Sequence, residues 1–369
     1  MSIASKFTFV GELIISKPKD ASHSNFYSEW KGGSKENIPM RKISFGIKDS
    51  PSNSAFVESF GREWDSIRAV DLDGNKVEIP WEDRNTEETL KILPYHKKFI
   101  VNLGPDYGDR HEFAAEYDMI KYLAENLKDF KGKLCVTGHW RKDAYKGRFI
   151  DKFIIKDVYA VESDRKSKLE LSMDFFYTHD SVDTADEKSE KKIYINGYVE
   201  QYIDKDTGSQ YLPQTAIMSL EKYDMENEIH VKRLKYRRGY LSKLSKKKMS
   251  HITWQCRYVN GSEEIEFDES MLTDRQKEQI ELGIKTLDDF KPSGGVLGNK
   301  KREVRLVDPI LKGVYNDGIV ECDETMEEFE DKIFKFEEDE KLEDVIKEDI
   351  LEAAKVEDSE SEDDMDDLF

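Results

Sequence analysis

The sequence predicts a mainly β fold with a few helices, built as two five-stranded barrels and followed by an acidic C-terminal tail, part helical and part disordered. Three observations lead to this fold class. Short runs rich in β-branched and aromatic residues recur along the first 320 residues and are separated by turn residues. Helical periodicity interrupts these runs at two places. The last 49 residues contain 24 Asp and Glu against 5 Lys and Arg, and carry −19 of the total charge of −20.

The length of 369 residues and the hydrophobic fraction of 37% are consistent with two modest cores. The predicted units are residues 1–163, a first barrel with an inserted hairpin; 164–320, a second barrel with a basic and aromatic segment; 321–357, an acidic amphipathic helical segment; and 358–369, a disordered acidic tail. No apolar run is long enough to span a bilayer, and the first residues lack the pattern of a signal peptide. With three widely spaced cysteines, a cytoplasmic protein is expected, in a bacterial host if a phage encodes it.

The first barrel is predicted from its order of elements. Three strands precede a helix and two strands follow it, which is the order of an oligonucleotide-binding (OB) barrel. A hairpin around Asp73-Gly74 is inserted before the helix, whose expected N-cap is Asp109. The expected strands are 6–16, 41–48, 54–60, 97–103 and a long pair within 131–162, with a long loop over 17–39.

The second barrel is predicted with less regular elements. Its expected strands are 169–177, 191–203, 210–220, a hairpin around Asn260-Gly261, and 302–320, with a helix opened by a capping box at Thr273. Residues 324–354 are expected to form one or two amphipathic helices.

A row of tyrosines and a basic segment form the candidate binding site of the second barrel. Tyr194, Tyr198 and Tyr202 alternate with the aliphatic side chains of one strand, and therefore share its other face. Nine basic and no acidic residues lie between Lys232 and Lys248. Rings can stack on bases and cations can bind phosphates. Two plainer alternatives stay open: the tyrosines pack under a neighbouring element, or the charges form a solvated face. The candidates in the basic segment are Lys232, Arg233, Lys235, Tyr236, Arg237, Arg238 and Tyr240.

The tail ends in Asp366-Asp367-Leu368-Phe369, where two large apolar groups stand beside a carboxylate. One interpretation is a solubilising tail. The other is a docking peptide for a partner protein, whose pocket takes the ring and whose basic residue takes the carboxylate.

The run from Lys131 to Glu162 resembles the fourth and fifth strands of bacterial single-stranded-DNA-binding proteins, and the acidic tail ending in Phe369 is similar to the tails of those proteins and of their bacteriophage counterparts. The greater length of this chain fits a phage-type protein better than a cellular one. The resemblance implies sequence-independent binding of single-stranded DNA in phage replication or recombination, with the tail recruiting partner proteins. Trp140, Arg141 and Lys142 join the candidate DNA-binding residues on this basis.

No catalytic motif, metal-ligand spacing or cofactor motif stands out, so we expect neither enzyme activity nor a cofactor. Two alternatives remain. One is a non-enzymatic, β-rich phage interaction protein whose tail mimics DNA. The other is a metal-dependent nuclease, because its carboxylates need not be adjacent in sequence.

Overall fold

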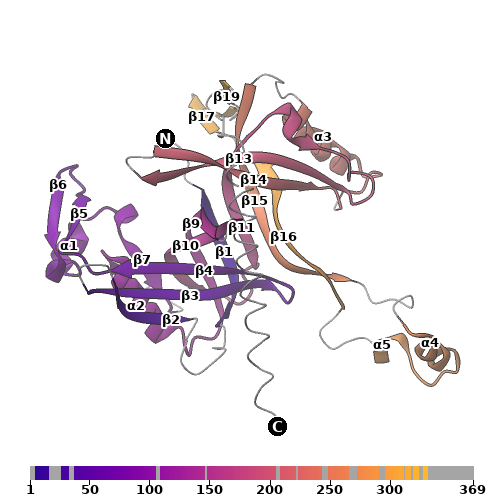
Figure 1. Ribbon diagram of the computed structural model, residues 1–369, viewed down its shortest axis with the longest axis horizontal. Coiled ribbons are helices and arrows are strands. Elements are labelled where there is room, and N and C mark those ends of the chain that lie inside the picture. The colour runs from indigo at the N-terminus through magenta and orange to yellow at the C-terminus, as the bar shows by residue number, and fades with distance from the viewer. Residues whose placement is uncertain are drawn as a thin grey trace, which may run out of the picture.

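The computed structural model describes a part of the chain that comprises residues 5–15, 26–32, 37–104, 109–145, 148–204, 208–221, 223–242, 248–265, 272–290, 296–310, 312–316, 319–323 and 327–330. Most of its strands join one continuous sheet, which closes on itself twice (Figure 1). The fold is therefore mainly β with a few helices, as predicted.

The first barrel is a closed ring of five strands. Its members are β1 (Lys6–Ile14), β3 (Ile38–Ser50), β4 (Asn53–Arg62), β9 (Lys133–Tyr145) and β10 (Arg148–Val161). Around the ring, β1 pairs with β3, β3 with β4, β4 with β10, β10 with β9, and β9 with β1. Of these five pairings, only that between β4 and β10 is parallel. With α2 (Glu116–Asn126) between the third and fourth strands, this is the predicted OB arrangement.

The segment between β4 and α2 forms a small lobe on the side of the first barrel. It contains β5 (Ser66–Val70), β6 (Lys76–Pro80), η1 (Trp81–Asp83), α1 (Glu87–Ile92), η2 (Tyr95–Lys97), β7 (Phe99–Asn102) and β8 (Arg110–Phe113). The predicted turn between β5 and β6 is confirmed, because Gly74 has a φ of 87° there. Ile79, Leu93 and Ala114 form a separate small core in this lobe.

Two predictions in the first barrel are wrong. Asp109 does not cap α2, which begins at Glu116 after Ala115, because residues 110–113 stay extended and pair with β7. The loop expected over 17–39 contains β2 (Tyr27–Gly32), which pairs with β3.

The second barrel repeats the order of the first. Its ring runs from β11 (Lys168–Tyr177) through β13 (Lys192–Asp204), β14 (Gly208–Ser219), β16 (Val296–Pro309) and β15 (Lys248–Ile265) back to β11. Again, within the ring, only the third and fifth strands, β14 and β16, pair in parallel. The short elements η4 (His179–Ser181) and β12 (Val182–Asp183) lie between the first two strands.

The helix of the second barrel is not the one the sequence predicted. The basic segment itself forms α3 (Glu228–Ser242), between the third and fourth strands. The helix opened by the Thr273 capping box, which is confirmed, is α4 (Asp274–Glu281). With α5 (Leu287–Phe290) it belongs to the connection between β15 and β16, and Figure 1 shows both extending away from the barrels.

The predicted turn at Asn260-Gly261 is also wrong, because β15 runs straight through it. Gly261 pairs with Asn53, and a Cβ at Gly261 would lie 1.6 Å from the carbonyl oxygen of Ser52. The glycine therefore permits a close approach of the β3–β4 turn.

The C-terminal part adds three short strands. They are β17 (Lys312–Asn316), β18 (Ile319–Asp323) and β19 (Glu327–Glu330). Because β19 pairs with β15, the helix predicted to cover these four residues is wrong, and the rest of the predicted helical segment lies outside the described residues.

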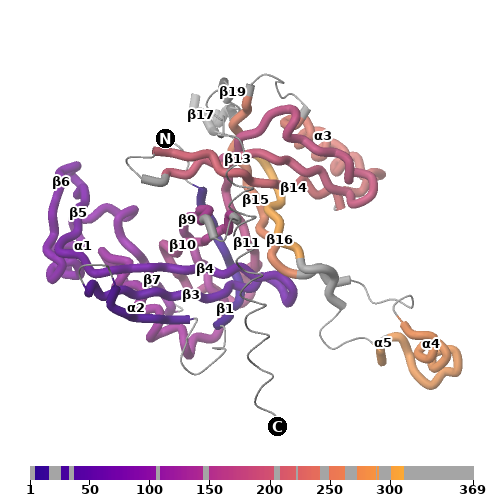
Figure 2. Tube along the Cα trace, viewed as in Figure 1, coloured from indigo at the N-terminus to yellow at the C-terminus, as the bar shows by residue number. Residues whose placement is uncertain are grey.

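The two barrels share one core. Their first strands pair antiparallel, Phe7–Val10 with Lys168–Leu171. Phe9 and Phe153 of the first barrel contact the ring of Tyr258 from the second, with centroid distances of 6.3 and 4.9 Å. Figure 2 shows the two barrels as adjacent bodies, with β3 and β4 crossing the lower one and β13 and β14 the upper one.

Candidate nucleic-acid interface

The outer face of β3 and β4 is built by strict alternation along β4. Ala55, Val57 and Ser59 point into the barrel and are fully buried, so the residues between them face outward. The outward row of β4 is Ser54, Phe56, Glu58, Phe60 and Arg62. Opposite it on β3 stand Lys48, Gly46, Ser44, Lys42 and Met40.

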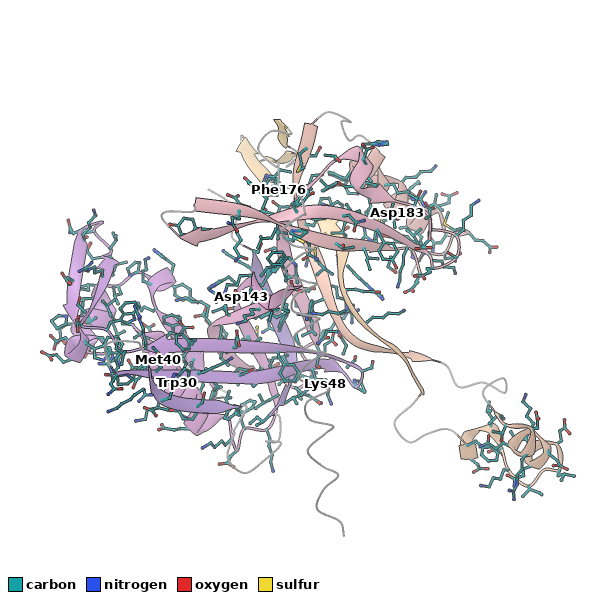
Figure 3. All side chains as sticks on the ribbon, in the orientation of Figure 1. Trp30, Met40, Lys48, Asp143, Phe176 and Asp183 are labelled. Carbon is teal, nitrogen blue, oxygen red and sulfur yellow. The ribbon has the colours of Figure 1, made fainter. Side chains whose placement is uncertain are left out.

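Exposed aromatic rings gather on this face. Phe56 and Phe60 are each 47% exposed, and Trp30 of β2 is 39% exposed. The centroids of the Trp30 and Phe60 rings are 5.8 Å apart. Trp64, just beyond β4, is 53% exposed, and the Arg62 guanidinium lies 3.5 Å from its ring centroid. Burying such rings is strongly favourable, so four of them left open on one face indicate a binding surface. Figure 3 labels Trp30, Met40 and Lys48 along this part of the lower barrel.

Two lysines, Lys42 and Lys152, lie beside the exposed rings. The Nζ atoms of Lys42 and Lys152 lie 2.9 and 3.3 Å from the carboxylate oxygens of Glu58, and Lys152 also contacts Asp143. Burial opposes ionisation of Glu58, but the two lysines together outweigh it and hold the pKa of this carboxyl below its usual value. Both ammonium groups are partly exposed, and can therefore contact a ligand on the face.

The predicted tyrosine row lies on the outer face of β13. Ile193, Ile195 and Val199 are buried on the inner face, so Tyr194, Tyr198 and Tyr202 point outward, as the alternation predicted. Tyr202 is the most exposed of the three. The Tyr194 hydroxyl donates to Glu190 at 3.1 Å, and Tyr198 packs partly against Phe176 and Met249. Tyr202 is 65% exposed.

The predicted basic residues lie on α3 and fall into two groups. Lys232, Arg233, Lys235 and Tyr236 are exposed. Arg237 pairs with Asp308 at 2.9 Å and Arg238 pairs with Glu187, so these two cations attach the helix to the barrel. Tyr240 is not a stacking residue as predicted, because it is buried in the core against Trp254.

Only the Tyr194 end of the tyrosine row lies near α3. Through Glu187, α3 is held near Glu190 and the Tyr194 end of β13. Tyr202 is eight residues further along, or roughly 27 Å at 3.4 Å per residue. At that end the Gln201 side chain is bonded to the first barrel. It accepts from the Lys142 N–H at 2.7 Å and donates to the Lys142 carbonyl at 2.8 Å.

The candidates on β9 require a correction. Trp140 is buried in the core and its indole N–H donates to the Ser172 carbonyl at 3.1 Å, so its ring offers no face to a ligand. Lys142 is buried as well and pairs with Asp151 at 3.2 Å. Arg141 alone of the three is exposed, and it contacts Asp143.

The predicted partner-binding residues Asp366, Asp367, Leu368 and Phe369 lie outside the described residues. Within the described ranges, no group of three or more His, Cys, Asp and Glu side chains is placed to hold a metal ion. No helix in the same part of the chain has the length and apolar character needed to cross a membrane.

Four exposed rings of this face, Trp30, Phe56, Phe60 and Trp64, were not predicted from the sequence. A signal for two of them was present. Phe56 and Phe60 occupy the same alternate positions as Glu58 and Arg62, so they stand on the polar face of an alternating strand. For Trp30 and Trp64 we find no comparable pattern in the sequence.

No family model matches the chain, and no curated protein matches it. Among solved structures, the chain is similar to a deletion mutant of the single-stranded DNA binding protein from Thermus aquaticus. That match has 9% sequence identity and a TM-score of 0.28, and it covers 69% of this chain and 86% of the other.

Proposed function

We propose that this protein binds single-stranded DNA without sequence preference, and that it does so without enzyme activity. The observation that carries the proposal is a set of exposed rings on the face formed by the second and third strands of the first barrel. Phe56 and Phe60 belong to the third strand and Trp30 to the adjoining β2, and Lys42 and Lys152 lie beside them. In OB barrels this face is the one that binds oligonucleotides.

The chemistry of the face suits an unpaired strand. Bases in a duplex are stacked on one another and do not offer their faces, whereas bases in a single strand can stack on protein rings. Such stacking does not depend on base identity, because every base has a π-face. Lys42 and Lys152 supply charge for the phosphates, and screening by salt should weaken that part of the binding.

The second barrel extends the proposed path. Tyr202 is the most exposed of the predicted tyrosines, and the two hydrogen bonds between Gln201 and the Lys142 backbone fix it beside the first barrel. A strand that leaves the first barrel near β9 can therefore meet Tyr202 next.

We further propose a role in phage DNA replication or recombination, in which the acidic tail acts twice. When no DNA is bound, residues 358–369 occupy the basic surface and so compete with DNA for it. When DNA displaces them, they present Leu368 and Phe369 to partner proteins. The charge and sequence of the tail support this role. Deleting residues 358–369 should tighten DNA binding and abolish partner recruitment, and unchanged or weaker DNA binding would contradict the competition.

The test of the main proposal is a fluorescence titration of labelled oligo-dT and of duplex DNA with the full chain, at two salt concentrations. We expect clear preference for oligo-dT and an affinity that falls steeply with salt. Equal affinity for the duplex, or no binding at low salt, would refute the proposal.

A further inference from the structure

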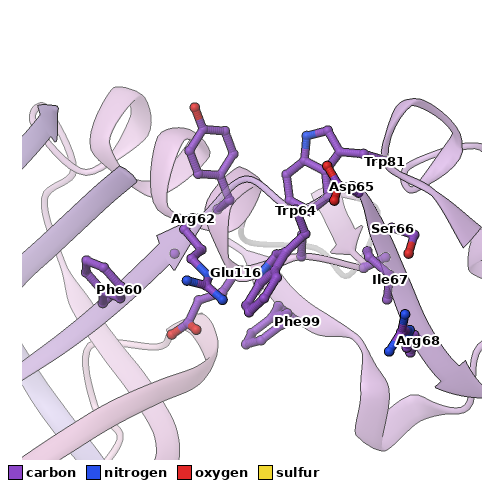
Figure 4. A pocket seen from close by; sticks show the side chains of 14 residues that line it. Phe60, Arg62, Trp64, Asp65, Ser66, Ile67, Arg68, Trp81, Phe99 and Glu116 are labelled. Carbon is purple, nitrogen blue, oxygen red and sulfur yellow. The ribbon is translucent and has the colours of Figure 1, made fainter. Parts of the chain in front are cut away.

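A cavity of about 630 Å³ opens at the end of β4, between the first barrel and the inserted lobe (Figure 4). Its volume is within the range of small-molecule sites, roughly 300–1,000 Å³. Phe60, Arg62 and Trp64 line it on the barrel side, Ile67 and Arg68 on the hairpin side, and Phe99 between them.

Beside the cavity, the lobe is joined to α2 by an ion pair and by ring contacts. Arg84 of the lobe makes a bidentate pair with Asp118 of α2, with N–O distances of 2.7 and 2.9 Å. Its guanidinium also lies 4.1 Å from the ring centroid of Trp81, which contacts Tyr117 edge-on at 5.9 Å. Because Trp81 and Tyr117 both line the cavity, these contacts fix its wall.

The lining combines rings with positive charge. Arg62 stands over the Trp64 ring, and the Lys156 Nζ lies 4.0 Å from the centroid of Phe99. Figure 4 shows Trp64 and Phe99 close to one another, with Arg62 beside them.

The lining also contains two acids. Asp65 is exposed, and the carboxyl of Glu116 accepts from the Ser59 hydroxyl, on the barrel side. Burial raises the pKa of Glu116, which disfavours its negative charge. Glu116 therefore opposes an anionic ligand less than a solvent-exposed carboxylate would.

The cavity is continuous with the outer face of β3 and β4, because Phe60 and Arg62 belong to both. The outward row of β4 leads from Phe56 through Phe60 to Trp64 at the cavity. A polymer lying along that row therefore reaches the cavity without a change of direction.

We propose that this cavity holds one nucleobase of the bound strand, inserted beside the Trp64 ring, with Arg62 and Arg68 at the adjoining phosphates. The inference rests on the proposed function. It adds a subsite that the inserted lobe creates and that a bare OB barrel would lack. A flat aromatic base joined to an anionic backbone matches a lining that combines aromatic rings with guanidinium groups.

The test uses the full chain and oligo-dT carrying a single 5-iodouracil, with photo-crosslinked residues mapped by mass spectrometry. We expect crosslinks at Trp64 as well as at Trp30 or Phe60. Crosslinks at Trp30 and Phe60 without Trp64 would overturn the subsite and leave the proposed function standing. Absence of any oligo-dT binding would instead overturn the proposed function.

Affinity supplies the second measurement. Loss of one base–ring stack should make Trp64→Ala bind oligo-dT about 5- to 150-fold more weakly, while Trp64→Phe keeps most of the affinity. Leu72→Ala is the matched control, because Leu72 is exposed at the turn of the same lobe and does not line the cavity. Equal affinities for Trp64→Ala and Leu72→Ala would contradict the proposal.

The acidic tail is the competing occupant. A synthetic peptide of residues 358–369 is added to the crosslinking reaction. If it removes the Trp64 crosslink at concentrations that leave the Trp30 crosslink intact, the base and the tail compete for the same cavity, which supports the cavity as a base subsite. Parallel loss of both crosslinks would show that the peptide competes along the whole face, and would leave the base in the cavity.

Discussion

Trp30 and Phe60 come from separate strands, β2 and β4, yet their rings lie 5.8 Å apart across β3. This contact is possible because both strands pair with β3 and both side chains face outward. It makes a partly exposed aromatic platform, and the proposed function depends on that platform.

Lys42 should contribute charge to binding. Replacing Lys42 with Ala should weaken binding to all oligonucleotides alike and reduce the slope of log K against log salt by about 0.7, the value expected for one phosphate contact to a single strand. Titrations at four salt concentrations measure the slope. Lys91→Ala is the control, because Lys91 pairs with Glu87 on α1, away from the face. An unchanged slope for Lys42→Ala would exclude it as a phosphate ligand.

Glu58 should oppose binding at neutral pH. Its carboxylate stands between Phe56 and Phe60 and engages both lysines, so Glu58→Gln should bind oligo-dT several-fold more tightly at pH 7. The difference should shrink as pH falls through the lowered pKa of Glu58, where the native carboxyl also becomes neutral. Titrations of both proteins across this pH range measure it, and equal affinities at pH 7 would contradict the prediction.

Glu58→Gln should also lower the free energy of unfolding near neutral pH. Because the folded-state pKa of Glu58 is depressed, its contribution to stability is present above the unfolded value of about 4.5 and is lost as pH falls through the folded value. Urea unfolding of both proteins from pH 3 to 7 measures this. A stability difference that does not change over that range would contradict the role of the ion pairs.

Tyr202 should matter only for longer strands. We expect Tyr202→Ala to weaken binding of an oligo-dT of about 30 nucleotides by about fivefold or more, and to leave an oligonucleotide of about 8 nucleotides unaffected, because one OB barrel covers roughly 4–16 nucleotides. Tyr202→Phe keeps the ring and serves as the control. Equal losses at both lengths would show that Tyr202 is not on an extended path.

Gly61 should be essential for packing α2 on β4. A Cβ at this position would lie 2.5 Å from the backbone nitrogen of Tyr117, so Gly61→Ala should lower the free energy of unfolding by roughly 1–3 kcal/mol. Gly239→Ala on α3 is the control. Nothing lies within 4 Å of its added Cβ, and alanine in a helix should stabilise by about 0.5–1 kcal/mol. Urea unfolding measures both, and similar values for the two would contradict the packing argument.

Local patterns predicted the elements well where alternation or capping decides the structure. The outward tyrosines of β13, the Asp73-Gly74 turn and the Thr273 capping box all follow from residues within one strand, turn or helix end. Each is set by neighbours in the sequence.

Features that depend on contacts between distant segments were not predictable in this way. Asn260-Gly261 has the composition of a turn, but the glycine is there because the β3–β4 turn approaches it. Trp140 shares a strand face with Leu134 and Val136, and closure of the barrel makes that face the core. Trp30 and Phe60 meet only because β2 and β4 flank β3.

The most direct test of the central claim is the affinity of Phe60→Ala for oligo-dT, measured by fluorescence anisotropy with Tyr95→Ala as a similarly exposed aromatic control on the inserted lobe. If Phe60 stacks on a base, its loss should weaken binding by about 5- to 150-fold, while Tyr95→Ala binds like the unmodified protein. Equal affinities for the two variants would contradict the assignment of this face as the binding surface.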